Sequence, residues 1–221
     1  MTQSPHHSES EATSRLVQQA ASGDPRALGT LLTQHQDRLL RIVGYRMDPR
    51  LRGRIDPADI LQEAYVEATH RFGDYAEDEE RMPFFLWLRF LTMQKLLQIH
   101  REHFNVKARN VEREISLSRL PSFQATSAVL AAQLLGKQTS PSEAAVRGEI
   151  QQKLERLLSS MEPIDREVLT LRHFEQLSNA EAARVLEIQE SAASSRYVRA
   201  IRRLKHLLDE AKIDPNSSAN W

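Results

Sequence analysis

The chain has 221 residues, with 30 basic and 30 acidic side chains and a formal net charge of zero, which argues against a protein that simply coats nucleic acid. It contains no cysteine, which excludes a disulfide scaffold, a thiolate zinc site and a cysteine nucleophile and fits a reducing cytoplasm. Glycine is scarce and strand-like alternation is nearly absent, so we expect an all-α protein. No apolar run is long enough to span a bilayer, so we expect no membrane association.

The pattern of apolar residues predicts two small helical domains joined by a linker. Apolar residues recur at three- and four-residue spacing before Phe104 and again after Ser142. The segment between them holds Pro121, Pro141 and several serine and threonine residues, which is typical of a linker. The expected bounds are 1–23 for a flexible N-terminal tail, 24–108 for the first domain, 109–142 for the linker, 143–210 for a helix-turn-helix domain and 211–221 for a C-terminal tail.

The helices of the first domain are marked by proline and glycine. Asp56 is a good N-cap residue, and Pro57 fits the first helical position because its missing N–H needs no partner there. We expect this helix to end at Gly73 as a C-terminal glycine, with a polar loop after it. Another long helix, apolar on most sides, is predicted over residues 84–104.

The helix that begins after Asp56 has an acidic and amide-bearing face opposite its apolar stripe. Asp59, Gln62, Glu63 and Val66 share this face because they are three or four residues apart. The simpler interpretation is a solvated helix face, and the motif alone favours it. The alternative is a docking face for an arginine-bearing partner, because carboxylates accept paired hydrogen bonds from guanidinium groups.

Aromatic and basic side chains are interleaved around the start of the 84–104 helix. Tyr75, Phe84, Trp87 and Phe90 lie in or beside a segment rich in lysine and arginine. Such rings can stack on unpaired bases while the cations hold phosphates. The alternative is a place in the core, which we expect for at least one of Trp87 and Phe85.

The same helix carries two histidines around an acid, but this does not predict a metal site. His100 and His103 flank Glu102, and no further set of metal-ligating side chains is evident. Zinc takes at least three protein ligands, so we expect no metal and no cofactor. The chain also has no phosphate-binding glycine loop and no nucleophile elbow, so we do not expect an enzyme.

The last quarter of the chain predicts a helix-turn-helix, whose second helix can lie in a DNA major groove. Ser178 and Glu181 form a capping box at the start of the first helix. The second helix is predicted to bury Ala193, Tyr197, Ile201, Leu204 and Leu208. Its other side carries Arg196, Arg199, Arg202, Arg203 and Lys205. The alternative is an ordinary helix pair whose basic face is only solvated.

In this order, three segments resemble the sigma factors of bacterial RNA polymerase, and more narrowly the extracytoplasmic-function group of the sigma-70 family. Residues 56–72, DPADILQEAYVEATHRF, are similar to the D-x-x-D-hydrophobic-x-Q-E helix of that family. Residues 84–103 resemble its promoter-melting and minus-ten-reading helix. Residues 154–186 match its second domain, including the P-x-x-R-E-V-L-x-L-R helix. The resemblance spans roughly residues 28–104 and 154–208.

The resemblance implies roles for individual residues. It assigns binding of the polymerase clamp coiled coil to Asp59, Gln62 and Glu63. It assigns contacts with the opened minus-ten strand to Phe72, Tyr75, Trp87, Arg89, Lys95, Gln98 and Arg101. It assigns contacts with the minus-35 element to Ser191, Ala192, Ser194, Ser195, Arg196, Arg199 and Arg203. It further implies capture of a flipped base by the loop over 73–83, docking of the second domain on the polymerase flap, and an anti-sigma factor as a further partner.

Two departures from the family pattern concern the helix-turn-helix. Glu187 stands in the turn, where the family usually has glycine or another small residue. The recognition helix starts with the short side chains of ESAASS, over residues 190–195, where long reading side chains are common. Alanine and serine discriminate bases less than arginine or glutamine. We therefore expect part of the upstream specificity to depend on DNA shape.

The leading hypothesis is a cytoplasmic sigma factor that binds core RNA polymerase and promoter DNA, directs promoter-specific initiation and helps to melt the promoter. A second hypothesis is a stand-alone helix-turn-helix regulator that never binds polymerase. A third is a helical adaptor whose basic faces are only solvated. Substitution of Gln62 and Glu63 distinguishes the first hypothesis from the second. Substitution of Arg196 and Arg199 tests the third hypothesis.

Overall fold

A computed structural model describes residues 5–48, 50–78, 80–104, 127, 130–131 and 144–210, and the regular structure in these residues is helical, as the composition predicts. Contacts divide the chain into two compact units. The first comprises Met1–Gly44 and Arg50–Pro121, and the second comprises Tyr45–Pro49 and Ser122–Trp221. Within the described residues, none of the helices combines the length and the apolar character that crossing a membrane requires.

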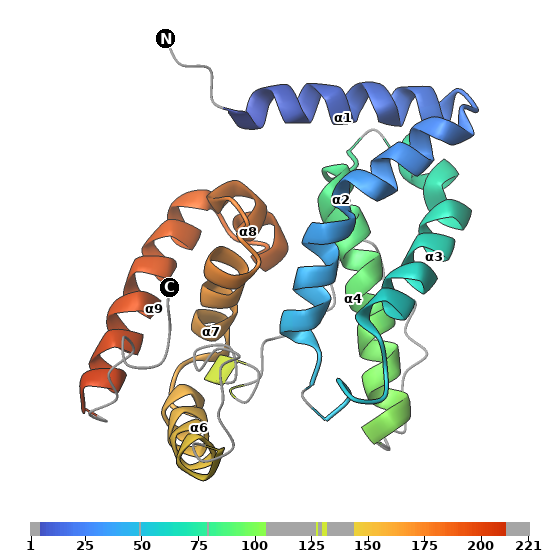
Figure 1. Cartoon of the computed structure of the whole chain (residues 1–221). Helices are drawn as coiled ribbons and strands as arrows, with labels where there is room; N and C mark the ends of the chain where they lie inside the picture. The colour runs from blue at the N-terminus through green and yellow to red at the C-terminus, as the bar shows by residue number, and fades with distance from the viewer. Residues whose placement is uncertain are drawn as a thin grey trace, which may run out of the picture. The chain divides into compact units, whose positions relative to one another are not determined.

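The first unit is a bundle of long helices crossed at one end by the N-terminal helix (Figure 1). Its helices are α1 (Pro5–Ala21), α2 (Pro25–Arg46, of which the last two residues are assigned to the second unit), α3 (Pro57–Glu77) and α4 (Phe84–Phe104). The expectation of a flexible tail over residues 1–23 is therefore corrected, because most of that segment forms α1. The helix packs against α3, and Val17 is buried. Burial of an apolar side chain stabilises a helix whose other residues are mostly polar.

The N-terminus of α3 is as predicted and its C-terminus is not. The Asp56 carboxylate accepts a hydrogen bond from the Ala58 N–H over 2.9 Å, with Pro57 in the first turn. However, α3 continues through Gly73 to Glu77. Phe72, just before the predicted end, and Tyr75, just beyond it, are both buried. Their burial outweighs the cost of about 1 kcal/mol for a glycine inside a helix.

Polar and aromatic contacts fix α2 against the other two long helices. The Tyr65 hydroxyl on α3 donates a hydrogen bond to the Leu32 carbonyl on α2 over 2.8 Å. The His35 ring lies 5.9 Å from the Phe84 ring and 5.4 Å from the Phe85 ring of α4. The Arg38 guanidinium lies over Phe85, 3.7 Å from the ring centroid. These contacts between helices therefore fix the position of the first turn of α4, which belongs to the predicted DNA-binding segment.

In the second unit, α6, α7 and α8 pack against the long helix α9 (Figure 1). Its elements are α6 (Ala144–Ser159), α7 (Pro163–Leu169), the π-helical turn η2 (Thr170–Phe174), α8 (Asn179–Leu186) and α9 (Glu190–Glu210). The core includes Leu154, Leu158 and Val168. Leu130 and Ala131, which fall in the predicted linker, are buried in this same core. Apart from Ser127, the rest of that linker lies outside the described residues, as does the predicted tail over 211–221.

A π-helical turn, η2, follows directly on the last residue of α7. The Glu175 N–H donates to the Thr170 carbonyl over 2.9 Å, which is a five-residue step instead of four. The chain then reverses through Gln176, whose φ of 55° is left-handed. The wider turn brings the Glu175 side chain into the interior.

The buried Glu175 is part of an ion cluster within the second unit. Arg46, in the segment Tyr45–Pro49 of this unit, is fully buried and donates two hydrogen bonds to Glu167, over 2.8 and 2.6 Å. It also pairs with Glu175. Burial alone lowers the pKa of Arg46, but the charges and hydrogen bonds of the two carboxylates raise this pKa above its ordinary value. Loss of the cation would leave two carboxylates buried without a counter-charge.

Candidate nucleic-acid and protein interfaces

The start of the helix-turn-helix is built as its sequence predicts. The Ser178 hydroxyl accepts a hydrogen bond from the Glu181 N–H over 3.1 Å, and the Glu181 carboxylate accepts one from the Ser178 N–H over 2.7 Å. This reciprocal pair is the predicted capping box. It fixes the orientation in which α8 begins.

The turn between α8 and α9 depends on a strained residue and a side-chain bridge. Glu187 adopts a left-handed φ of 54°, and the Ile188 N–H donates to the Ala183 carbonyl over 3.0 Å. The Asn179 side chain donates to the Glu190 carbonyl over 2.9 Å. The first residues of α8 and α9 are thereby joined directly. These contacts set the angle at which α9 leaves the turn.

The packing side of α9 differs from the prediction at Ile201, Ala200 and Leu207. Ala193, Leu204 and Leu208 face inward as expected, but Ile201 is 38% exposed. Ala200 and Leu207 are buried in its place. Ala182 and Ala183 of α8 and Ala193 of α9 are also buried, and small side chains permit the close approach of these two helices. Ala200 instead belongs to the core that α9 shares with α6 and α7, so the buried stripe centres on Ala200 and Ile201 lies at its edge.

Two arginines of the P-x-x-R-E-V-L-x-L-R segment are structural. Arg166 donates a hydrogen bond to the Leu158 carbonyl near the end of α6 over 3.0 Å. Arg172 donates to the Leu177 carbonyl over 2.6 Å, and its guanidinium lies 5.4 Å from the centroid of the Tyr197 ring on α9. Sequence reasoning did not assign them these roles.

The residues that the resemblance assigned to the minus-35 element lie on α9, and all of them except Arg196 are exposed. The exposed members are Ser191, Ala192, Ser194, Ser195, Arg199 and Arg203. Arg202 and Lys205 are also exposed on the same helix. Arg196 instead turns toward α7, where its Nη1 lies 3.0 Å from Asp165 Oδ1 and 3.5 Å from Glu162 Oε2.

The residues assigned to the polymerase clamp lie together on the outer side of α3. Asp59, Gln62 and Glu63 are exposed, and Val66 beside them is 58% exposed. The opposite side of α3 is buried through Ile60, Leu61, Ala64 and Ala68. The structure therefore brings these three polar residues together on one exposed face that also holds an apolar side chain.

Four residues assigned to the minus-ten strand are buried instead. Phe72, Tyr75 and Trp87 form a cluster in which the Tyr75 and Trp87 rings stack with centroids 4.4 Å apart. Arg89 is also buried. The Tyr75 hydroxyl donates to the Met82 carbonyl over 2.9 Å. Burial raises the pKa of Tyr75 to about 12, with Arg81 opposing and Asp78 adding to this rise.

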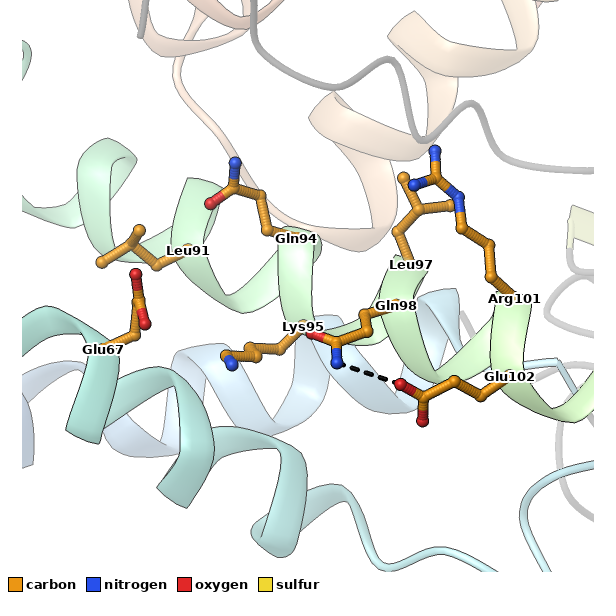
Figure 2. A pocket seen from close by; sticks show the side chains of 8 residues that line it. All are labelled: Glu67, Leu91, Gln94, Lys95, Leu97, Gln98, Arg101 and Glu102. Atoms are coloured by element: carbon orange, nitrogen blue, oxygen red, sulfur yellow. Dashed lines mark hydrogen bonds between the residues drawn. The ribbon is translucent and has the colours of Figure 1, made fainter. Parts of the chain in front are cut away.

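The other three minus-ten residues, Lys95, Gln98 and Arg101, line one pocket of about 480 Å³ on the first unit (Figure 2). The lining comes from α4 and from one residue of α3: Glu67, Leu91, Gln94, Lys95, Leu97, Gln98, Arg101 and Glu102. The Gln98 amide nitrogen donates to the Glu102 carboxylate over 3.0 Å, which leaves the amide oxygen as an acceptor. Cations, amides and leucines thus surround a space large enough for a small planar group.

Histidine and acidic side chains do not form a metal centre in the part of the chain that the structure describes, since no three of them gather closely enough to share an ion. His100 and His103 belong to this part and lie on α4.

Comparisons with known proteins agree with the geometry of both units. The family model "Sigma-70, region 4" matches residues 151–204, which include the helix-turn-helix. The RNA polymerase sigma factor NccH of Alcaligenes xylosoxydans xylosoxydans is 27% identical over 202 residues, covering 90% of this chain and 95% of that protein. The ECF RNA polymerase sigma factor BldN of Streptomyces coelicolor is 28% identical over 206 residues, covering 93% and 69%.

A solved structure is similar in fold to this chain. It is that of CnrH in complex with the cytosolic domain of CnrY, and it matches with a TM-score of 0.52 and 26% identity over 90% of this chain and 98% of that one. CnrH is an RNA polymerase sigma factor of Cupriavidus metallidurans. With the helix-turn-helix, the acidic face of α3 and matches along most of the chain, this protein is similar to the extracytoplasmic-function group of sigma-70 factors, which are non-enzymatic proteins that direct transcription initiation.

Proposed function

We propose that this sigma factor binds core RNA polymerase and reads promoters in two parts, as an upstream duplex and as an opened strand. The observation that carries the proposal is the outer side of α9. Arg199, Arg202, Arg203 and Lys205 are exposed there, and no acidic residue interrupts residues 191–208. Closely spaced cations of this kind neutralise DNA phosphates. The N-terminal turns of the second helix in a helix-turn-helix enter the major groove.

The upstream element is read mainly by the first turns of α9. Ser191, Ser194 and Ser195 are exposed beside the turn that orients the helix. Serine hydroxyls contact bases or phosphates with little discrimination. The arginines therefore anchor the helix on phosphates, and DNA shape contributes to the choice of sequence.

The opened minus-ten strand is held by the pocket on α4. Lys95 and Arg101 would bind phosphates, while the amide of Gln98 would meet a base edge. The buried aromatic residues Phe72, Tyr75 and Trp87 would support this helix from below instead of stacking on bases. The loop proposed to capture a flipped base is shorter than 73–83, because α3 extends to Glu77.

The exposed face of α3 is proposed to bind the clamp coiled coil of polymerase, and part of the second unit is proposed to dock on the flap. Asp59 and Glu63 offer carboxylates to arginine side chains, and Gln62 adds an amide. Val66 supplies apolar area on the same face, at the C-terminal end of this polar set. Apolar contacts combined with polar ones are typical of a protein interface.

An anti-sigma factor is proposed as a further partner. The support is the match to CnrH, which was solved with the cytosolic domain of CnrY and resembles this chain over 90% of its length. We expect a protein that copurifies with this chain from its natural host to abolish transcription when it is added back to the holoenzyme. A copurifying protein without effect on transcription would argue against this part of the proposal.

Run-off transcription with core polymerase and a promoter library tests the main proposal. We expect the chain to stimulate transcription from a defined subset of promoters, and no stimulation would overturn the proposal. The double substitution Gln62→Ala, Glu63→Ala should weaken binding to polymerase about tenfold or more. A matched control is Glu11→Ala, Gln19→Ala on exposed positions of α1, which should bind as the unchanged chain does. DNA binding without polymerase binding by the unchanged chain would favour a stand-alone regulator.

A further inference from the structure

An exposed valine lies among the hydroxyl and cationic side chains of α9. Val198 is 43% exposed, although it belongs to a helix that packs with α7 and α8 on its inner side. A β-branched residue is a weaker helix former than alanine. Since Val198 contributes little burial within the unit, its apolar surface is available to a partner.

The angular position of Val198 around the axis of α9 shows on which side of the helix it lies. Residues of an α-helix advance by about 100° each, so Val198 lies about 200° around the axis from the fully buried Ala200. Ile201, the other exposed apolar residue of α9, lies only about 100° away, at the edge of the packed side. Ser191 and Arg202 are on the same outer side as Val198. Val198 is therefore near the centre of the face that points away from the core.

The charges around Val198 indicate the kind of partner. Arg199 and Arg202 are exposed next to it, and Lys205 is exposed two turns further on. These cations complement phosphates, and they would disfavour a purely apolar partner surface. The ridge from Ser191 to Val198 is about 10 Å long, which is the height of about three base pairs.

We propose that the Val198 side chain contacts the 5-methyl group of a thymine in the upstream promoter element. This inference rests on the proposed function, in which α9 enters the major groove of that element. The thymine methyl is the one apolar group that a base displays in this groove, and apolar side chains recognise it. The serines beside Val198 do not distinguish a methyl group from hydrogen. Val198 thus supplies base specificity that the short polar side chains of α9 lack.

Methyl scanning of a selected promoter tests the proposal. Holoenzyme formed from the full chain and core polymerase first selects upstream sequences from a randomised duplex library. Each thymine of the selected element is then replaced by deoxyuridine, which removes only the methyl group. At one position we expect affinity to fall about three- to fivefold, the effect of losing one buried methyl or methylene group. Val198→Ala should bind with the same affinity to the thymine and the deoxyuridine duplex at that position.

Two further variants keep the test specific. Ile201→Ala removes an apolar side chain at the edge of the helix and should retain the methyl sensitivity. Val198→Thr keeps the shape of the side chain, replaces one methyl with a hydroxyl and should lose part of the sensitivity.

The outcomes separate failure of this inference from failure of the proposed function. If no upstream sequence is enriched, the proposed reading of the duplex by α9 fails. If sequences are enriched but no thymine is sensitive, or if Val198→Ala retains the sensitivity, the thymine contact is overturned. A loss of affinity for polymerase in Val198→Ala, with methyl sensitivity intact, would assign Val198 to a protein interface and would also overturn it.

Discussion

The Arg196 guanidinium of α9 donates a hydrogen bond to the Asp165 carboxylate of α7 over 3.0 Å. The two side chains are 27% and 20% exposed, so solvent screens the pair only in part. Glu162, which is largely exposed, adds a second carboxylate at 3.5 Å. Arg196 was predicted to contact DNA, but its charge is already partly compensated within the unit. Arg199 and Arg203 are exposed and should therefore contribute more to DNA affinity.

Removal of the Asp165 charge should strengthen promoter binding. We expect Asp165→Asn to raise the affinity of the holoenzyme for promoter DNA by about two- to tenfold, because the variant frees Arg196 for phosphates and removes one repulsive charge. The same variant should lower the free energy of unfolding by up to about 1 kcal/mol. Binding titrations at several salt concentrations measure the first effect, and denaturant unfolding measures the second.

The control for this prediction is Asp209→Asn, which removes an exposed acid near the end of α9. It changes the net charge equally but breaks no contact with Arg196. An equal gain of affinity in both variants would mean that the gain results from the change in net charge and not from the release of Arg196. A loss of affinity in Asp165→Asn would mean that Asp165 orients Arg196 for DNA.

Glycine at position 187 should stabilise the helix-turn-helix. Glu187 has a left-handed φ of 54°, which costs a residue with a side chain roughly 1 kcal/mol relative to glycine. We expect Glu187→Gly to raise the free energy of unfolding of the second unit by about that amount, as measured by denaturant titration. Glu187→Ala keeps the strain and should show no comparable gain. Destabilisation by glycine would indicate that the Glu187 side chain makes a stabilising contact.

The stability of the first unit should fall in strongly alkaline solution. Burial raises the pKa of Tyr75 from 10.0 to about 12, so the folded chain favours the neutral phenol. This contribution is complete below pH 10, declines as the pH rises toward 12 and is lost above it. Burial, with a smaller effect of Asp37, likewise raises the pKa of Tyr65 to about 12, so both residues contribute in this window.

Tyr75→Phe separates the contribution of Tyr75. At neutral pH the variant should lose about 1 kcal/mol of stability, because the hydrogen bond to the Met82 carbonyl is removed. Between about pH 10 and 12 its stability should decline less steeply than that of the unchanged chain, since one titrating group is absent. Unfolding curves recorded across this range measure both slopes. Equal slopes would contradict the assignment to Tyr75.

Charge removal in the α4 pocket should weaken binding of the opened strand and leave duplex binding unchanged. We expect Lys95→Ala or Arg101→Ala to reduce the affinity of the holoenzyme for a single-stranded minus-ten oligonucleotide about three- to tenfold, with a shallower salt dependence. The matched control is Arg15→Ala on α1, where the side chain is 78% exposed and far along the chain from the pocket. A similar loss for the control, or a loss confined to duplex DNA, would contradict the role of the pocket.

The sequence by itself determined the features that depend on neighbouring residues. Asp56 with Pro57, and Ser178 with Glu181, specify helix starts because each cap is closed by groups within three positions. The helical class and the resemblance to sigma factors follow from such local signals taken in order. The acidic face of α3 is equally local, since three- and four-residue spacing places Asp59 and Glu63 on one side of the helix.

Only the tertiary structure decided which side chains reach the surface. Gly73 is a plausible helix end on its own, but burial of Phe72 and Tyr75 carries α3 past it. Ile201 fits the apolar stripe of α9, but Ala200 and Leu207 occupy the core that α9 shares with α6 and α7. The sequence predicts that Arg196 contacts DNA, but in the structure Arg196 donates a hydrogen bond to Asp165, 31 residues away. Burial and ion pairing depend on segments distant in the chain, and no local pattern contains that information.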